Sequence, residues 1–302
     1  MDSHSLKVLE YDRVLALIAA RTQNVLGRKL VLAMRPMRRY AQICSKHSLY
    51  ADLFGLQQST LSLPPLFSED LSEALQRVSP KDAVLSIEEL LLCRGQLDVV
   101  QQLCQLCRNP EMQQFETLSA LLLRFEPCDV LSRRLHACLK EDGDVPDSAS
   151  SELQMLRREI RALQKKLQNS LEALLKDPAL EDVLQERFVT VRNGRYVLPV
   201  RREARSMLPG LVHDQSNSGQ TLFLEPASSL NMGNELAGLK LQERDEVRRI
   251  LAELSAMLRS HLEHFKQNQQ NLAELDAAAA ITRWALLYDC ELPKFGPEPK
   301  LR

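Results

Sequence analysis

Two long helical patterns, separated by a short β-rich segment, constrain the fold of this chain more than any other feature. In the first, apolar residues recur from Leu153 to Leu167 at alternating spacings of three and four, while charged residues fill the outward positions. This spacing is typical of a helix that packs along one narrow stripe. We expect the helix to cover about 25 residues, roughly 38 Å, within residues 146–185, and to end near Asp177-Pro178.

The second pattern begins after Pro226 and continues to about Tyr288 without an internal proline. A single helix of roughly 60 residues would be about 90 Å long, so residues 226–290 are predicted to form one extended return helix. Its middle, Lys266–Asn271, is polar on all sides, which predicts exposure to solvent. Because two long helices that flank an insertion must run out and back, we expect an antiparallel coiled-coil arm.

The intervening residues 186–225 form a β-rich segment. Asn193-Gly194 lies between two β-prone runs, and this dipeptide is a strong hairpin signal because both turn positions need positive φ. A longer loop, Ser216–Gly219, joins a second pair of runs, so we expect a small four-stranded antiparallel sheet. Pro199 cannot donate a ladder hydrogen bond, and its strand is therefore predicted to be an edge strand or to carry a bulge.

Residues 1–145 are predicted to form a helical base. Apolar residues recur at helical spacing, and Ser86 with Glu89 three residues later is a capping box that begins a helix. The expected fold is mainly α: a helical base and a long antiparallel coiled-coil lever that carries a small antiparallel β insertion. Residues 291–302 would form a C-terminal tail.

Composition narrows the classes of function. The net charge is −1 and the pI is about 6.6, so nucleic-acid binding would require a local basic patch on a nearly neutral molecule. No run approaches the roughly 20 apolar residues of a membrane span, and the N-terminus has no apolar signal core. These features predict a cytoplasmic protein without a membrane partner.

The seven cysteines are expected to be reduced thiols. Cys104 and Cys107 form a lone C-x-x-C inside an apolar helical pattern, without a second pair. His261 and His264 have helical i, i+3 spacing, but the sequence offers no third ligand, so a solvated helix face is the simpler interpretation. We therefore predict no metal site.

Positive charge is concentrated around the β-rich segment. Six arginines and a single acid, Glu203, lie between residues 187 and 205. The planar guanidinium can donate two hydrogen bonds to one phosphate, so this cluster predicts contacts with a nucleic-acid backbone. A solvated edge with surface ion pairs is the alternative, and the residues alone do not separate the two. The candidate binding residues are Arg187, Arg192, Asn193, Arg195, Arg201, Arg202 and Arg205.

The sequence contains no catalytic constellation. Neither the G-x-x-x-x-G-K-[ST] phosphate loop nor the H-E-x-x-H zinc motif occurs, and the acids alternate with Arg and Lys as on solvated helix faces. We therefore expect no catalytic residue, no metal and no cofactor in this chain.

Three segments resemble the second bacterial branch of the MutS family, which does not serve classical mismatch repair. They are EDGDVPDSASSELQMLRREIRAL (Glu141–Leu163), VTVRNGRYVLPVRREARSMLPGLVHDQSNSGQTLFLEP (Val189–Pro226) and NELAGLK (Asn234–Lys240). The opening LEYDRVLALIAARTQNVLGRKL is similar to the start of the same family's core region. The resemblance covers essentially the whole chain and is most specific between Asp147 and Pro226.

The resemblance implies an architecture and a set of partners. Residues 1–145 and the C-terminal end would form the base, the long helices a lever, and residues 186–225 a clamp that closes around nucleic acid in a dimer. The clamp arginines and Asn193 are the residues carried over, without a catalytic role. The expected partner is duplex or branched DNA, in recombination suppression and repair. The alternatives are the ribosomal RNA of stalled or collided ribosomes, and a partner protein bound by a coiled-coil scaffold.

The chain also departs from the family. Family members continue into an ATPase domain with a Walker motif for ATP and Mg²⁺, and often into an Smr nuclease domain, whereas this chain stops at Leu301-Arg302. ATP binding, ATP-driven dimer closure and nuclease activity are therefore not expected in these 302 residues. On the resemblance, the chain would be a fragment of a longer protein or a truncated homologue.

Overall fold

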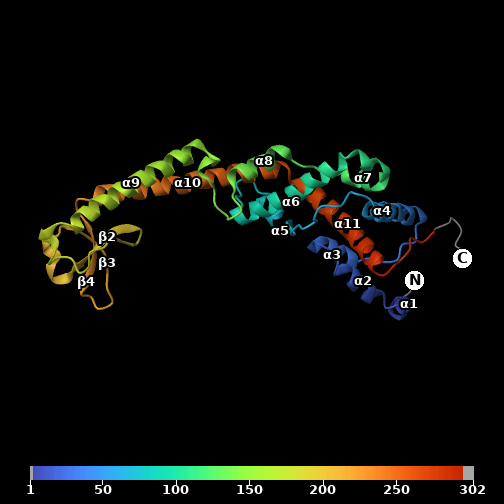
Figure 1. Cartoon of the computed structure of the whole chain (residues 1–302), viewed down its shortest axis with the longest axis horizontal. Helices are drawn as coiled ribbons and strands as arrows, with labels where there is room; N and C mark the ends of the chain where they lie inside the picture. The colour runs from blue at the N-terminus through green and yellow to red at the C-terminus, as the bar shows by residue number, and fades with distance from the viewer. Residues whose placement is uncertain (1–2, 295–302) are drawn as a thin grey trace. The chain divides into compact units, whose positions relative to one another are not determined.

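The computed structural model of the chain describes residues 3–294 (Figure 1). The chain divides into two compact units: a helical unit, Met1–Asp144 with Leu251–Arg302, and a sheet unit, Val145–Ile250. Within the described residues, every helix is too short or too polar to cross a membrane. Most of the tail predicted at 291–302 lies outside the described residues, from 295 onwards.

The helical unit is built mainly of helices, three of which, among the described residues, begin with a side-chain cap, from Asn24, Ser86 and Asn109. Ser86 Oγ accepts from the Glu89 N–H, and the Glu89 carboxylate accepts from the Ser86 N–H, so the predicted capping box is confirmed. Besides the last part of α10, the elements are α1 (Ser3–Val8), α2 (Tyr11–Ala19), α3 (Val25–Leu32), α4 (Tyr40–Gln58), α5 (Ser72–Val78), α6 (Ile87–Cys107), η1 (Pro110–Gln114), α7 (Glu116–Leu122), α8 (Asp129–Cys138) and α11 (Leu262–Leu287).

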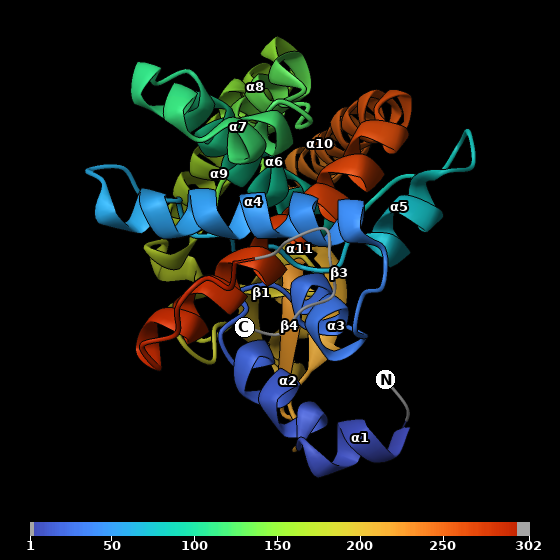
Figure 2. The same ribbon diagram turned by 90° about the vertical axis from the view of Figure 1, so that its right-hand side faces the viewer.

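Helix α11 is the centre of the helical unit. It lies between α4 on one side and α2 and α3 on the other (Figure 1, Figure 2). The four small side chains of Ala277–Ala280 are buried, which lets the neighbouring helices approach closely. Just before them, the buried Asp276 carboxylate accepts from the backbone N–H groups of Gln23 and Asn24 and pairs with Arg283 at 3.1 Å. These bonds join the α2–α3 loop to α11.

The predicted single return helix is interrupted. Helix α10 (Leu230–Ser260) ends one residue before α11 begins. Between them His261 has φ −114° and ψ 16°, and its N–H donates to the carbonyl of Leu258, three residues back instead of four. The expectation of one continuous helix across 226–290 is therefore wrong. No proline or glycine lies at the break, so the sequence pattern carries no signal of it.

The polar stretch Lys266–Asn271 is not exposed on all sides, and this prediction is wrong as well. Asn268 and Asn271 are fully buried. Asn268 exchanges hydrogen bonds with both backbone groups of Glu126, at 3.0 and 2.8 Å, and Asn271 donates to the Arg124 carbonyl at 3.0 Å. These amides satisfy backbone groups of the loop before α8 that form no helical hydrogen bonds there.

The sheet unit combines one long helix, the start of another, and a four-stranded sheet. The strand order is β1-β2-β4-β3 with antiparallel neighbours throughout, so a mainly helical chain with a small antiparallel sheet is confirmed. Its elements are η2 (Asp147–Ala149), α9 (Ser151–Leu175), η3 (Pro178–Leu180), β1 (Thr190–Arg192), β2 (Arg195–Arg201), η4 (Arg202–Met207), β3 (Gly210–Gln215), β4 (Thr221–Pro226) and the first part of α10.

Both predicted hairpins are present. Asn193 and Gly194 have φ of 48° and 76°, as a two-residue turn between β1 and β2 requires. The second turn, between β3 and β4, contains Gly219 at φ 70°. The turn chemistry of the sequence therefore identifies both connections correctly.

Pro199 lies in an interior strand without a bulge, so the prediction of an edge strand or a bulge is wrong. The pairing of β2 with β1 stops at Val197. Beyond that point the same side of β2 faces the segment before β1: the Gln185 N–H donates to the Pro199 carbonyl, and the Arg201 N–H donates to the Val183 carbonyl, both at 2.9 Å. Because Pro199 has no N–H, it cannot donate a hydrogen bond in this short additional pairing. The pairing of β2 with β4 is unaffected.

Helix α9 pairs in antiparallel with the first part of α10. Ser150, which caps α9, donates from Oγ to Glu246 Oε1 at 2.5 Å, and Arg157 donates from Nε to Glu243 Oε1 at 2.7 Å. Later residues of α9 thus meet earlier residues of α10. Both helices contribute to the apolar core beneath the sheet, which includes Ile160, Leu167, Leu171, Leu198, Leu224 and Leu236.

Candidate nucleic-acid interface

One of the predicted binding residues, Arg195, is paired with a buried carboxylate. Glu225 on β4 is only 1% exposed, and its two oxygens lie 3.5 Å from Arg195 Nη1 and 2.6 Å from His213 Nε2. The bulge between Val212 and Asp214 interrupts the register of β3 at His213. Arg195 therefore balances an internal charge, a role that a count of arginines does not reveal.

The β1–β2 turn holds two further candidates against the neighbouring strands. The Arg192 guanidinium carbon lies 4.5 Å from the centre of the Phe223 ring, and its Nε lies 3.7 Å from Asp214 Oδ2. Asn193 donates from Nδ2 to the His213 carbonyl at 3.1 Å. Both side chains fix the turn in place, while the Arg192 side chain stays about half exposed.

Two more arginines contact local groups. Arg187 forms an exposed ion pair with Glu181 at 2.9 Å. Arg205 in η4 donates to the carbonyls of Leu208 and Gly210, at 3.4 and 2.8 Å, and so ties η4 to the start of β3. Neither contact buries a charge, but each restrains the guanidinium.

Arg201 and Arg202, which are neighbours in the chain, both lie beside the β3–β4 loop. Arg202 donates from Nη1 to the Gly219 carbonyl at 3.2 Å, and its backbone N–H donates to the Gln220 carbonyl at 2.9 Å. The Arg201 guanidinium forms no hydrogen bond or ion pair with any other residue of the described chain, 3–294. It is therefore available to a ligand without the loss of an internal contact.

These two arginines line an open hollow of about 620 Å³ in the sheet unit. Its lining contains one acid, Glu203, beside the two guanidinium groups, so its net charge is positive. Such a site suits an anionic oxygen, because a guanidinium donates charge-assisted, paired hydrogen bonds. The other lining residues come from two further segments: Gln185 before β1, and Ser218, Gly219 and Gln220 of the β3–β4 connection. Sequence reasoning identified the arginines but did not bring Gln185 or Gln220 beside them.

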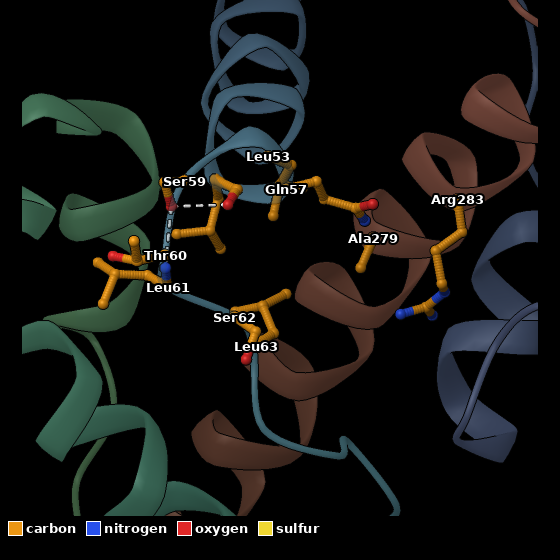
Figure 3. A pocket seen from close by; sticks show the side chains of 10 residues that line it. Leu53, Gln57, Ser59, Thr60, Leu61, Ser62, Leu63, Ala279 and Arg283 are labelled. Carbon is orange, nitrogen blue, oxygen red and sulfur yellow. Dashed lines mark hydrogen bonds between the residues drawn. The ribbon is translucent and has the colours of Figure 1, made fainter.

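A second pocket, in the helical unit, is lined by several hydroxyl groups and a single ionisable side chain. It measures about 350 Å³ and lies between the end of α4, the following loop and α11 (Figure 3). Ser59 Oγ in this loop donates to the Leu56 carbonyl (Figure 3). Arg283 is the one ionisable lining residue, and it already donates to the Arg21 carbonyl and to Asp276. The pocket supports no catalytic proposal.

The cysteines are free thiols, as predicted. Cys104 and Cys107 have Sγ atoms directed at different carbonyls, those of Phe125 and Ser119, and burial raises the pKa of each thiol. The expectation that His261 and His264 lack a third potential ligand is wrong, since the structure places Cys128 beside them. The signal is absent from the sequence because more than a hundred residues separate this cysteine from the histidines.

Comparison with known proteins gives a consistent result. No protein-family model matches the chain. It is 36% identical to Endonuclease MutS2 of Pelotomaculum thermopropionicum, 33% to that of Symbiobacterium thermophilum and 32% to that of Carboxydothermus hydrogenoformans, over 97–100% of its own residues. It spans only 37–38% of the length of each of these relatives. The resemblance to the MutS family, in its MutS2 branch, is thus confirmed along nearly the whole chain.

Proposed function

We propose that the sheet unit contacts the sugar–phosphate backbone of duplex or branched DNA, with Arg201 and Arg202 as its principal phosphate ligands. The single observation that carries this proposal is the unpartnered Arg201 guanidinium, in an open basic hollow that it shares with Arg202. Contacts of this kind position a nucleic acid without reading its bases, because sequence is read at base edges in the grooves.

The other predicted residues take secondary roles in this proposal. Arg187 and Arg192 are exposed enough to exchange their surface ion pairs for phosphates, at little cost because such pairs contribute little to stability. Asn193 and Arg205 shape the β1–β2 turn and η4. Arg195 is needed for the fold of the sheet and is not offered as a DNA contact.

The names of the relatives support the choice of a nucleic acid. They are called endonucleases, a class that acts on nucleic acids, and this chain matches little more than a third of their length. In the proposed whole protein, residues 186–225 form the clamp, residues 146–185 and 226–290 the coiled-coil lever, and residues 1–145 the base. In this proposal, ATP binding, nuclease activity and self-association, all in the cytoplasm, belong to the longer protein. The 302 residues of this chain contribute binding and no catalysis.

The test is a salt titration of binding to a four-way DNA junction and to linear duplex, with the chain and its R201E/R202E variant. Loss of two phosphate contacts should reduce the slope of log K against log [salt] by about 1.8. Affinity for both DNAs should fall together, since no base is read. The K165E/K166E variant makes the same change of charge on an exposed part of α9 and should keep most of the affinity.

Equal binding by the parent chain and R201E/R202E would refute the role of the hollow. Ribosomal RNA presents the same phosphate chemistry, so a competition arm with RNA of stalled ribosomes distinguishes the two polymers. Preference for RNA over DNA would overturn the choice of DNA while keeping the site. Binding to a protein partner that is insensitive to salt and to charge reversal would favour a scaffold instead.

A further inference from the structure

Three side chains with metal-binding atoms lie close together at the junction between α10 and α11. Cys128 precedes α8, His261 is the residue at the break between the two helices, and His264 lies in the first turn of α11. Their ligand atoms all lie within 4.8 Å of one another. We propose that Cys128, His261 and His264 form a binding site for a zinc-like divalent cation.

The spacing of the atoms carries the proposal. His261 Nδ1 and His264 Nδ1 are 3.3 Å apart, and Cys128 Sγ is 3.9 Å from His264 Nδ1. Tetrahedral Zn²⁺, with bonds of about 2.0–2.1 Å to nitrogen and 2.3 Å to sulfur, places two nitrogens roughly 3.3 Å apart and a nitrogen and a sulfur roughly 3.6 Å apart. Two of the three distances are thus close to ligand spacing, and the third, between Cys128 and His261, is no more than 4.8 Å.

The backbone supports this convergence at two of the three residues. Cys128 has φ 46°, a left-handed conformation that residues other than glycine seldom adopt. His261 departs from helical geometry in a chain segment that contains neither proline nor glycine. Both unusual conformations direct a side chain toward the same point, and His264 reaches it from the i+3 position on the adjoining turn.

The surroundings suit a cation. Two acidic residues, Glu126 and Asp129, lie within two positions of Cys128 in the sequence, close enough to act electrostatically on its thiol. Cys128 and His261 are half-buried while His264 is exposed, so an ion can enter and a water molecule can fill the fourth tetrahedral position. Thiolate and imidazole together favour Zn²⁺, Co²⁺ or Cu over Mg²⁺ and Ca²⁺, which prefer oxygen.

Such an ion would fasten the start of α8 to the α10–α11 junction. Because the three ligands come from two segments far apart in sequence, the bound ion would oppose both straightening of the helix break and separation of α8 from it. A ligand that binds only the folded state stabilises it by mass action, by about 2.7 kcal/mol at a hundred times its Kd. The expected effect is stabilisation of this junction, although the open fourth position distinguishes the site from a closed four-ligand zinc site.

The test is a titration of the whole chain, without a polyhistidine tag and with its thiols reduced, with Co²⁺ and then Zn²⁺. Co²⁺ should produce tetrahedral d–d absorption and a thiolate-to-metal charge-transfer band at one equivalent, and Zn²⁺ should displace it. C128S should abolish the charge-transfer band, and both C128S and H264N should weaken binding at least about tenfold, since even the loss of an outer-shell partner costs about 10–100-fold.

The controls separate this site from the other thiols. The C104S/C107S variant removes the C-x-x-C pair and should leave the cobalt spectrum, the stoichiometry and the affinity unchanged. Zinc should raise the Tm of the parent chain and of C104S/C107S but not that of C128S, whose folding is checked by circular dichroism. Absence of saturable binding by the parent chain, or an unaltered spectrum in C128S, would overturn the proposal.

Discussion

Gly233, in the first turn of α10, lies so close to Glu225 that a β-carbon at position 233 would overlap the Glu225 Oε1 atom. The same β-carbon would lie 3.0 Å from Arg195 Nη1. Glycine at this position lets the helix pass directly beside the buried ion pair of the sheet. The absence of a side chain, rather than conformational freedom, is what the position requires.

The G233A variant should therefore be less stable than the parent chain. A methyl group ordinarily stabilises a helix interior by about 1 kcal/mol relative to glycine, but here it displaces a buried carboxylate. We expect a net loss of about 1–3 kcal/mol, as in overpacked cores. The free energy of unfolding in urea measures the change.

Gly238, five residues further along α10, is the matched control, because a β-carbon there meets no atom within 4 Å. G238A should gain up to about 1 kcal/mol. Equal gains in both variants would show that the sheet yields easily around Glu225. In the sequence the two glycines look alike, near the start of a long helix. Only the fold distinguishes them, since it places Glu225 beside one of them.

The arginines of the sheet unit also differ in their surroundings, so replacing Arg195 and replacing Arg201 should change stability by different amounts. R195A removes the partner of a buried carboxylate and should cost about 3 kcal/mol, because breaking a buried pair leaves an uncompensated charge. R201A removes a guanidinium without an internal partner and should change stability by less than about 0.5 kcal/mol. Thermal and urea unfolding of both variants provide the comparison. A small effect of R195A would mean that His213 alone balances Glu225.

The sequence predicted the sheet well but could not predict how its arginines are used. Strands and turns follow from local signals, namely alternating apolar residues and the Asn193-Gly194 turn. The partner of Arg195 lies thirty residues away on β4, and its approach depends on the strand order. Local spacing therefore identifies a basic segment, while tertiary structure decides which charges remain available.

The buried side chain of Asn268, in the polar stretch of α11, should contribute to the stability of the helical unit. Its amide satisfies both backbone groups of Glu126, so N268A should leave a donor and an acceptor unpaired inside the helical unit. We expect a loss of about 1–3 kcal/mol, the cost of roughly one buried unsatisfied group, because the two backbone groups of Glu126 are only partly buried. Q270A, at an exposed position of the same helix, should have almost no effect. Similar unfolding curves for the two variants would contradict the assigned role.

This misprediction has a physical cause. A polar run in a helix ordinarily predicts solvent exposure, because buried polar groups need partners. Here the partners are backbone groups of the loop around Glu126, and no pattern within Lys266–Asn271 reports a loop that lies 140 residues earlier. The break at His261 likewise lacks a local signal, since neither proline nor glycine lies there.

The antiparallel pairing of α9 with α10 should weaken in acid. Hydrogen bonds from Arg249, and a further one from Ser150, hold the pKa of Glu246 below its ordinary value, although desolvation acts in the opposite direction. A carboxyl group whose pKa is lower in the folded state stabilises that state above its unfolded pKa, about 4.3 for Glu. This contribution is lost as the pH falls through the lower, folded pKa.

We therefore expect the free energy of unfolding to decrease between about pH 5 and pH 3, and the E246Q variant to show a shallower decrease. Urea unfolding at intervals of half a pH unit measures both slopes. The control is E159Q, at an exposed position of α9, which should follow the parent chain. If E246Q and the parent chain lose stability in parallel, neither the Arg249 nor the Ser150 contact of Glu246 depends on the carboxylate charge, and other acids account for the acid sensitivity.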